Sequence, residues 1–307
     1  MERERGVREG PATSTDAAAR PAGRTRFAPA PTGYLHLGHV ADAIWVWSQA
    51  AATDRRVLLR IEDHDRTRCR PEFDAALLED LAWLGFVADD GPVRQSDDPA
   101  PYLEALAGLR RDGVVYGCDC TRSTFAAWLA EHGRAWHGAG CPGSCRARDL
   151  GGPVLRVRIG GGSESWMDVI VGPCTGEVAS GGDPAIRDRD GNWTYLFAVV
   201  VDDRRQRIDL VVRGRDLLAA TPDQIRLGRL LGRERPATFG HHPLVRRPDG
   251  SKLSKAAGDT GVRELRAAGH TPDEVVAMAA AAIGFTGDPT IGRHGRERED
   301  VGTPHMR

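Results

Sequence analysis

The chain has 307 residues, of which 28% are charged, and its formal net charge at pH 7 is −1. This length can bury one large core, or one core with a smaller inserted module. The near balance of charge excludes a protein coated with nucleic-acid-binding surface, although it leaves room for a local basic patch. Six cysteines in so long a chain exclude a disulfide scaffold.

The first residues carry no apolar period. Residues 1–24 are rich in arginine, alanine and glycine, and we expect them to form a disordered leader. No signal-peptide core precedes the first motif, and nowhere do about 18 apolar residues run together. The sequence therefore predicts a soluble, cytoplasmic protein without a membrane partner.

A strand, a turn and a helix are expected next. The strand covers Thr25–Ala28, the turn contains several prolines and glycines, and the helix covers Val40–Ala52. His36 and His39 face the same way where this helix begins, and the unpaired N–H groups and positive dipole there favour a polyphosphate ligand. Gly38 has no Cβ, which lets a flat group such as a purine ring approach the main chain. Taken alone, H-x-G-H is equally compatible with two surface histidines in a turn.

A second strand and two helices continue this pattern. The strand Arg56–Ile61 is apolar and is followed by Glu62, as expected for a buried parallel strand with a carboxylate at its C-terminal edge, where ligands of open α/β sheets bind. Helices are predicted over residues 71–84 and 102–111. The alternation predicts the α/β class, with residues 25–113 as the first half of a Rossmann-like, doubly wound parallel sheet.

The pattern is interrupted over residues 114–182, which we interpret as an inserted module of the acceptor-binding type. Its cysteines form two close pairs about twenty residues apart, a spacing that suits the tetrahedral coordination of zinc. The alternative is four reduced cysteines without a common role. The predicted ligands of a structural zinc ion are Cys118, Cys120, Cys141 and Cys145.

The α/β pattern returns in residues 183–258, the expected second half of the nucleotide-binding domain. The apolar runs Leu196–Val201 and Ile208–Val212 are typical of parallel strands. Thr221 is followed by a proline and, three residues on, by a glutamine. This arrangement predicts a capping box that opens a helix ending at Leu231.

Residues 259–286 are expected to form a short helical extension. Thr271 begins a second capping box, before a helix over Val275–Ile283. The polar residues 287–307 are predicted to form a disordered tail. Only about fifty residues follow Lys255, too few for a separate domain that could grip an anticodon.

Two lysines, Lys252 and Lys255, lie beside small hydroxyl residues and behind a Pro-Asp-Gly turn, which suits a mobile loop that neutralises charge on phosphates. With the histidines they carry a family resemblance. His36-Leu37-Gly38-His39 and Lys252-Leu253-Ser254-Lys255 resemble the HIGH and KMSKS signatures of class I aminoacyl-tRNA synthetases. Arg26-Phe27-Ala28-Pro29 and Arg60-Ile61-Glu62-Asp63 resemble the glutamyl branch of that family.

This resemblance implies ATP-dependent activation of L-glutamate. The implied catalytic residues are His36, His39, Lys252 and Lys255, which would stabilise charge on the phosphates. ATP, accompanied by Mg²⁺, would contact His36, Gly38, His39 and Lys255. Members of the glutamyl branch often carry zinc in the corresponding insertion, which favours the zinc hypothesis.

The resemblance also implies a glutamate pocket. Two arginines would bind the carboxylates, because the planar guanidinium donates hydrogen bonds in pairs, and a glutamate would take the ammonium. Ala30 stands where the family usually has serine, and the missing hydroxyl contact would weaken binding by about 0.5–1.5 kcal/mol or mark a shifted substrate. The implied glutamate-binding residues are Arg26, Ala28, Ala30, Glu62, Tyr195 and Arg213.

Because no anticodon-reading region is expected, the chain most resembles the truncated paralogues that transfer glutamate to queuosine at the wobble position of tRNA(Asp). One alternative is a minimal, monomeric synthetase that charges a tRNA 3′ end. Another is a non-catalytic, zinc-stabilised module that binds ATP or RNA. The presence of both histidines and both lysines favours an enzyme, and we expect a monomer.

Overall fold

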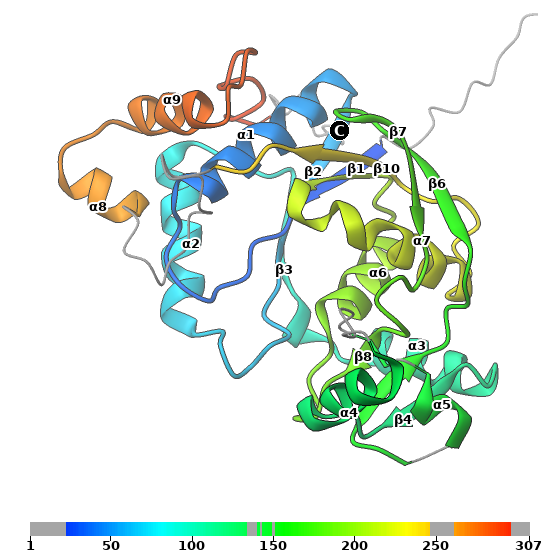
Figure 1. Ribbon diagram of the computed structural model, residues 1–307. Helices are drawn as coiled ribbons and strands as arrows, with labels where there is room; N and C mark the ends of the chain where they lie inside the picture. Colours follow the sequence, from blue (N-terminus) through cyan, green and yellow to red (C-terminus); the bar gives the residue numbers. More distant parts are fainter. Residues whose placement is uncertain (1–22, 134–139, 142, 149–150, 246–260, 296–307) are drawn as a thin grey trace, which may run out of the picture.

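The computed structural model describes residues 23–133, 140–141, 143–148, 151–245 and 261–295. A largely parallel sheet lies at the centre of the catalytic part of the molecule (Figure 1). Its strands form two parallel groups, β3-β2-β1 and β9-β10. The N–H of Asp209 donates to the carbonyl of Arg24 at 3.0 Å, so β9 continues the sheet beside β1. The predicted α/β class is confirmed. The strands are β1 (Gly23–Phe27), β2 (Arg55–Ile61), β3 (Asp90–Arg94), β9 (Leu210–Gly214) and β10 (Thr238–His242).

Helices cover both faces of this sheet (Figure 1). Alternate residues of β9 point to opposite faces: Leu210 and Val212 pack into the core with α1, whereas Val211 packs with α7. The first face carries α1 (Leu37–Ala52), α2 (Pro71–Leu84), α8 (Val262–Ala267) and α9 (Pro272–Ala282). The second face carries α6 (Tyr195–Arg205) and α7 (Thr221–Leu230), with α3 (Ala100–Arg111) packed on α6.

The local signals of the first half are confirmed. The predicted strand–turn–helix unit appears as β1 and α1, and the predicted second strand as β2. Helix α2 begins with Pro71 at its first position and ends at Gly85, whose φ of 80° lies in the left-handed region that favours glycine. A short 3₁₀ helix, η1 (Gln95–Asp97), leads from β3 to α3.

A small antiparallel sheet forms the inserted module, in the order β4-β5-β8. It lies at the opposite end of the molecule from α9 (Figure 1). Its elements are β4 (Val115–Cys118), α4 (Arg122–His132), α5 (Ser144–Arg148), β5 (Val154–Val157) and β8 (Ala185–Arg187).

The module's boundaries differ from the prediction. The hairpin of β6 (Ser163–Asp168) and β7 (Gly172–Glu177) was expected within the insertion, but β6 pairs in parallel with β10 and so extends the catalytic sheet. Conversely, β8 lies beyond the expected end of the insertion and pairs with β5. Strand pairing between distant segments decides these boundaries, and local composition does not encode it.

Residues 196–201 form part of a helix, so the predicted strand is wrong. Phe197, Ala198 and Val199 in α6 are at most 1% exposed, because α3, α7 and β8 surround the helix. A short apolar run is compatible with either a buried strand or a buried helix. Here the surrounding elements decide in favour of the helix.

The two predicted capping boxes have different outcomes. At α9 the box is confirmed: the Thr271 hydroxyl accepts the N–H of Glu274, and the Glu274 carboxylate accepts the N–H of Thr271. At α7 the prediction is wrong, because the 3₁₀ helix η2 (Arg215–Ala220) runs directly into α7 and Ala220 occupies the cap position. Thr221 is already helical, and its buried hydroxyl contacts a side chain of β9.

The segment after α9 turns back onto the first face. Residues 287–295 were expected to be disordered, but the N–H of Val87 donates to the carbonyl of Arg293 at 2.8 Å. The Arg293 side chain is buried and binds Asp273 at 2.5 Å. The disorder prediction is therefore wrong for this part of the tail.

Other predictions fall outside the described residues. These are the leader up to residue 22, the tail from residue 296, and the loop that carries Lys252 and Lys255. Among the helices that the structure does describe, none combines the length and apolar character needed to cross a membrane.

Candidate active site

The H-x-G-H sequence forms the N-terminal cap of α1. His36 Nδ1 accepts the backbone N–H of Gly38 at 3.0 Å, and His39 Nδ1 accepts the backbone N–H of His36 at 3.2 Å. The two imidazole rings lie 4.0 Å apart between centroids. Because both Nδ1 atoms accept hydrogen bonds, each neutral ring carries its proton on Nε2. Each histidine therefore has Nε2–H as its donor at a helix N-terminus.

Gly38 lies directly beside the ring of His36. A Cβ at this position would lie 2.8 Å from Cε1 of His36, which is too close for a real contact. A side chain at position 38 would therefore force the His36 ring to move. The predicted approach of a purine ring to Gly38 stays a prediction.

Both flanks of the lysine loop lie against this turn. His36 forms an antiparallel bridge with Gly261, and the N–H of Val262 donates to the carbonyl of Leu35 at 2.9 Å. At the other flank, His242 at the end of β10 lies 2.8 Å from Asp42 of α1. The chain thus leaves and re-enters the described structure beside α1.

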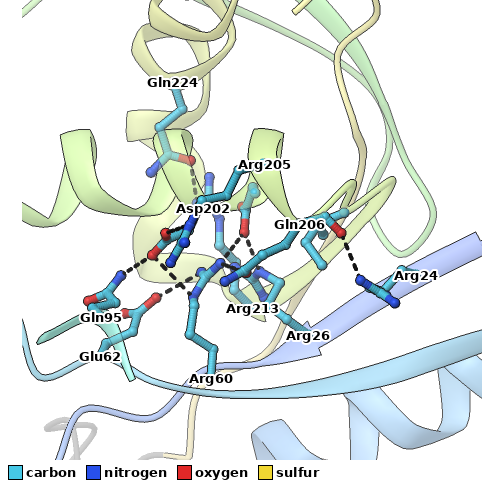
Figure 2. Close-up of polar contacts among 12 residues, drawn as sticks. Arg24, Arg26, Arg60, Glu62, Gln95, Asp202, Arg205, Gln206, Arg213 and Gln224 are labelled. Atoms are coloured by element: carbon cyan, nitrogen blue, oxygen red, sulfur yellow. Dashed lines mark hydrogen bonds and ion pairs between the residues drawn. The ribbon is translucent and has the colours of Figure 1, made fainter. Parts of the chain in front are cut away.

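A buried ionic network lies under the carboxyl ends of β1 and β2 (Figure 2). Arg60 is fully buried, and its guanidinium lies 2.7 Å from Asp203 and 2.9 Å from Glu62. Arg26 lies 3.4 Å from the same Asp203. Burial by itself would lower the pKa of Arg60, but the neighbouring carboxylates raise it above its ordinary value. For Asp203, burial opposes ionisation, yet Arg60 and Arg26 lower its pKa.

Asp202 extends this network toward α3. Its carboxylate accepts hydrogen bonds from the hydroxyl of Tyr102 at 2.9 Å, from Gln95 at 2.7 Å and from Arg205 at 2.7 Å. Burial, followed by the charge of Asp202, raises the pKa of Tyr102 well above its ordinary value. Tyr102 is therefore a neutral donor that helps to hold the carboxylate in place.

The structure brings the predicted polar glutamate-binding residues together. Tyr195 is half-buried, and burial raises the pKa of its hydroxyl, on which the charges of Arg213, Glu62 and Arg26 also act. The N–H of Glu62 donates to the carbonyl of Pro29 at 3.0 Å, which joins the end of β2 to the turn after β1.

That turn contains Ala28 and Ala30, which are both half-buried. The carbonyl of Ala30 accepts the N–H of Thr32 at 2.8 Å, so this main-chain group holds the turn. A serine side chain in place of Ala30 would not be needed for the turn to form.

Arg26 and Glu62 each use only some of their terminal polar atoms in hydrogen bonds within the protein. Arg26 Nη1 donates to the carbonyl of Val212 at 2.9 Å, and Glu62 accepts from Arg60 through Oε1. Within the described part of the chain, neither Nη2 of Arg26 nor Oε2 of Glu62 has a hydrogen-bond partner. A guanidinium nitrogen and a carboxylate oxygen are thus available in a preformed site.

Arg213 is held by several side chains from β10 and α7. Its Nε donates to His241 at 3.0 Å, Nη1 donates to Gln224 at 2.5 Å and Nη2 donates to Thr221 at 2.8 Å. Burial lowers the pKa of Arg213, and the nearby Arg26 adds to this effect. Figure 2 shows Arg213 between Arg26 and Gln224.

The four predicted zinc ligands meet in one buried cluster. All four sulfur atoms lie within 4.8 Å of one another, with Cys120 3.6 Å from Cys141 and 3.4 Å from Cys145. A tetrahedral zinc–thiolate site with bonds of about 2.3 Å needs sulfurs about 3.8 Å apart, so the donor set and its spacing fit. Burial raises the pKa of Cys120. Burial also opposes ionisation of Cys141, but backbone N–H groups and the neighbouring thiols outweigh it and lower its pKa to about 7. The cluster can therefore hold a metal ion.

Sequence reasoning missed most of the residues that support the site. Arg60 was noted only as part of a family motif, and Asp203 was given no role of its own. Charged residues inside an otherwise apolar strand, or at the end of a buried helix, are rare unless they are paired. This signal could have identified both residues, but it would not have named their partners.

Residues 23–136 and 144–288 match the family described as tRNA synthetases class I (E and Q), catalytic domain. The chain belongs to this family. The protein is accordingly a ligase-type enzyme with a class I synthetase catalytic domain.

Three relatives are especially informative. A glutamyl-Q tRNA(Asp) synthetase from Symbiobacterium thermophilum is 40% identical over 86% of this chain and 87% of its own length. A glutamate–tRNA ligase from Acidithiobacillus ferrooxidans is 38% identical over 82% of this chain, but the match spans only 55% of that ligase. A similar fold is found in the crystal structure of a glutamate tRNA ligase from Elizabethkingia meningosepticum in complex with its amino acid, with a TM-score of 0.72 and 25% sequence identity. The superposed region spans 90% of this class I synthetase chain and 65% of the ligase chain.

Proposed function

We propose that this class I synthetase activates L-glutamate with ATP and transfers it to queuosine at the wobble position of tRNA(Asp). The gathering of Arg26, Glu62, Tyr195 and Arg213 in one site carries the proposal, because the charges of the other three all act on Tyr195. The relative named glutamyl-Q tRNA(Asp) synthetase supports the choice of acceptor, because the match extends over 87% of its length.

In the first step, an oxygen of the glutamate α-carboxylate attacks the α-phosphorus of ATP, and pyrophosphate leaves with the electrons of the broken P–O bond. Arg26 and Arg213 bind the carboxylates of the amino acid, because guanidinium groups donate in pairs. Glu62 binds the ammonium, and Tyr195 lines the pocket. The ionic network around Arg60 holds these groups in position before glutamate arrives.

Charge on the phosphates is stabilised by the cap of α1. The Nε2–H groups of His36 and His39 and the N-terminal dipole of the helix favour the negative charge of the transition state. In the same proposal, Lys252 and Lys255 would neutralise charge on the phosphates. Mg²⁺ would accompany ATP, held mainly by its phosphates and by water, and would neutralise part of their charge.

In the second step, a hydroxyl of the queuosine cyclopentene-diol attacks the acyl carbon of glutamyl-adenylate. A new ester bond forms, the bond to the phosphate oxygen breaks, and AMP leaves. The hydroxyl proton passes to the leaving group or to solvent. No covalent intermediate with the enzyme is required.

The cysteine cluster belongs to the same proposal as a structural zinc site. Cys118, Cys120, Cys141 and Cys145 would hold the ion, which would tie the end of β4 to the first turn of α5 and the residues just before it. Four thiolates leave no open coordination position, so the ion would stabilise the module and take no part in the reaction. Cytoplasmic location and a monomeric state remain predictions.

A second candidate is a minimal synthetase that charges the 3′ end of a tRNA. The 38% identity to a glutamate–tRNA ligase favours it. The two functions share the first step and differ in the acceptor. They therefore predict the same glutamate-dependent exchange of pyrophosphate into ATP.

The deciding experiment is transfer of labelled glutamate, with ATP, onto tRNA from queuosine-containing and queuosine-deficient cells, followed by nuclease mapping of the label. We expect label in the anticodon loop, and only when queuosine is present. Label on unmodified tRNA(Asp), or at the 3′ end, would refute the queuosine proposal. Absence of both label and glutamate-dependent exchange would leave a binding protein.

A further inference from the structure

Behind Arg213 lies a buried pair of ionisable side chains from two other strands. His241 of β10 lies 3.0 Å from Nε of Arg213 through its own Nε2. Its Nδ1 lies 2.5 Å from the carboxylate of Asp168, at the end of β6. The side chains of His241 and Asp168 are both fully buried. The three residues therefore form a chain that leads from the proposed glutamate pocket into the extended sheet.

The direction of each hydrogen bond follows from the chemistry of the groups. A guanidinium can only donate, so His241 must accept at Nε2 and is neutral. Its remaining proton is then on Nδ1 and is donated to Asp168. Burial lowers the pKa of His241 to about 4, which agrees with a neutral ring at physiological pH. One tautomer of His241 alone satisfies both neighbours.

Asp168 is itself held by the main chain. Its Oδ1 accepts the N–H groups of Ile170 at 3.0 Å, of Val171 at 2.9 Å and of His241 at 3.2 Å. Burial opposes ionisation of this carboxyl, but the His241 ring and these N–H groups lower its pKa below the ordinary value. Asp168 is therefore a fixed carboxylate, and it leaves Oδ2 for His241.

The other donors of Arg213 complete the clamp. Thr221 and Gln224 of α7 take Nη2 and Nη1, so the plane of the guanidinium is held from three directions. Tyr195, another residue of the proposed glutamate pocket, is also a side-chain hydrogen-bond partner of Arg213. The clamp therefore fixes the face of the guanidinium that lies toward the pocket.

We propose that Asp168 and His241 are positioning residues, which fix the guanidinium of Arg213 in the orientation that receives a carboxylate of glutamate. The inference rests on the proposed role of Arg213 and adds the cause of its orientation. It also explains why the β6–β7 hairpin joins the catalytic sheet: the end of β6 delivers the carboxylate that sets the His241 tautomer.

Three substitutions test the two ends of this chain. Asp168→Asn keeps the size of the side chain, but its amide can donate to Nδ1 of His241 and so favours the wrong tautomer, whose Nε2–H opposes the Arg213 N–H. His241→Asn retains a donor for Asp168 and loses the acceptor for Arg213. His241→Gln places an acceptor near the Nε2 position and loses the contact with Asp168.

The measurement is glutamate-dependent pyrophosphate exchange, with KM determined separately for glutamate and for ATP. For Asp168→Asn and His241→Asn we expect the KM for glutamate to rise about 10- to 100-fold with the KM for ATP unchanged. His241→Gln should recover part of this loss. In the wild-type protein, ¹⁵N chemical shifts of His241 should report a proton on Nδ1, and in Asp168→Asn a proton on Nε2.

Asp183→Asn is the matched control. Asp183 is a buried carboxylate of the inserted module that binds the hydroxyl of Tyr116 at 2.9 Å. Its substitution should lower the thermal midpoint without changing the KM for glutamate. An equal rise of both KM values in the Asp168 and His241 variants would indicate a general structural role and overturn the inference.

The possible failures can be told apart. A wild-type protein without glutamate-dependent exchange would refute the proposed function. An active wild type, together with His241→Asn that keeps its KM for glutamate, would refute only the positioning role. If Asp168→Asn does not fold, the comparison of His241→Asn with His241→Gln still decides, because recovery by glutamine requires an acceptor facing Arg213.

Discussion

The ionic network around Arg60 and the cysteine cluster are both buried and polar, but they balance charge differently. In the network, Arg60 lies 2.7 Å from Asp203, 2.9 Å from Glu62 and 3.9 Å from Asp202. In the cluster, Cys120 faces two other thiols, Cys141 and Cys145. The protein itself neutralises the first site, whereas the second gathers four groups of the same kind.

The difference matters because isolated buried charges are costly. A charge removed from water must be compensated by a partner or a proton. The network is compensated by its own side chains, so the proposed glutamate pocket is formed before any ligand binds. The thiols are compensated by their protons, or by a dication once the protons leave. We therefore expect the two regions to respond in opposite ways to metal removal and to substitution of a single charge.

Metal removal should have the largest effect, and should act on the cysteine cluster alone. Chelation, or Cys141→Ser, is expected to remove stabilisation on the order of 10 kcal/mol from the inserted module. Hydrogen exchange should then increase in β4 and β5, and transfer to tRNA should fall more than pyrophosphate exchange. Cys174→Ser is the matched control, because Cys174 is half-buried and lies outside the cluster. A protein purified without chelator that holds less than about half an equivalent of zinc, with all four thiols titratable, would contradict this prediction.

Loss of the central cation should have the next largest effect. Arg60→Met leaves the carboxylates of Glu62 and Asp203 without their main partner in a buried site. The free energy of unfolding should fall by about 3–5 kcal/mol in denaturant titration, with zinc content unchanged. Arg229→Met removes a more exposed cation, 3.1 Å from Glu164, and should cost at most about 1 kcal/mol. Similar losses of unfolding free energy for Arg60→Met and Arg229→Met would show that burial of the cation does not decide how much it contributes to stability.

Asp80 is a buried carboxylate outside the network, and it has no cation close enough to compensate its charge fully. Its contribution to folding stability should therefore depend on pH. Burial raises its pKa to about 6, although Arg263, 3.5 Å away, partly opposes this. The folded state therefore binds a proton more tightly than the unfolded chain, whose aspartate has a pKa of about 3.9. Stability from this group is present below about pH 4 and is lost as the pH rises through about 6.

Asp80→Asn should consequently stabilise the protein by about 2–3 kcal/mol at pH 8 and have little effect at pH 4. Urea unfolding at the two pH values measures this difference. Glu79→Gln, at the neighbouring exposed carboxylate, is the control and should not reproduce it. A variant that is equally or less stable at pH 8 would show that Asp80 is compensated in the folded protein.

Glu62→Gln should have the smallest effect on stability and a specific effect on substrate. The glutamine oxygen can still accept from Arg60, but the charge proposed to bind the ammonium of glutamate is lost. The KM for glutamate in pyrophosphate exchange should rise by about 10- to 100-fold, a loss of about 1.5–3 kcal/mol, with the KM for ATP unchanged. An unchanged KM for glutamate would remove Glu62 from the pocket.

The catalytic core shows how far the sequence alone could be interpreted. The strand–turn–helix unit of β1 and α1, the strand β2, and the ends of α2 and α9 follow from signals that lie within a few residues of each other. Apolar periodicity, a proline at the first helical position and a glycine after the last turn act locally, so they can be identified without knowing the fold. The predicted helix α7 also exists, although its predicted cap does not.

The failures share one physical reason. The apolar run that became α6, the hydroxyl of Thr221 that binds Arg213, and the hairpin that joined β10 all depend on contacts with segments distant in sequence. A local pattern defines which groups need burial or a hydrogen bond, but it does not specify their partners.

The sequence by itself determined the α/β class, the position of the H-x-G-H cap and the residues that resemble a glutamate pocket. It also determined that four cysteines could share one ion. Tertiary structure alone decided that Asp203 and Glu62 meet on Arg60, and that Asp168 reaches Arg213 through His241. The cost of burying a charge makes such pairings obligatory, and only the packing of distant strands and helices selects the partner.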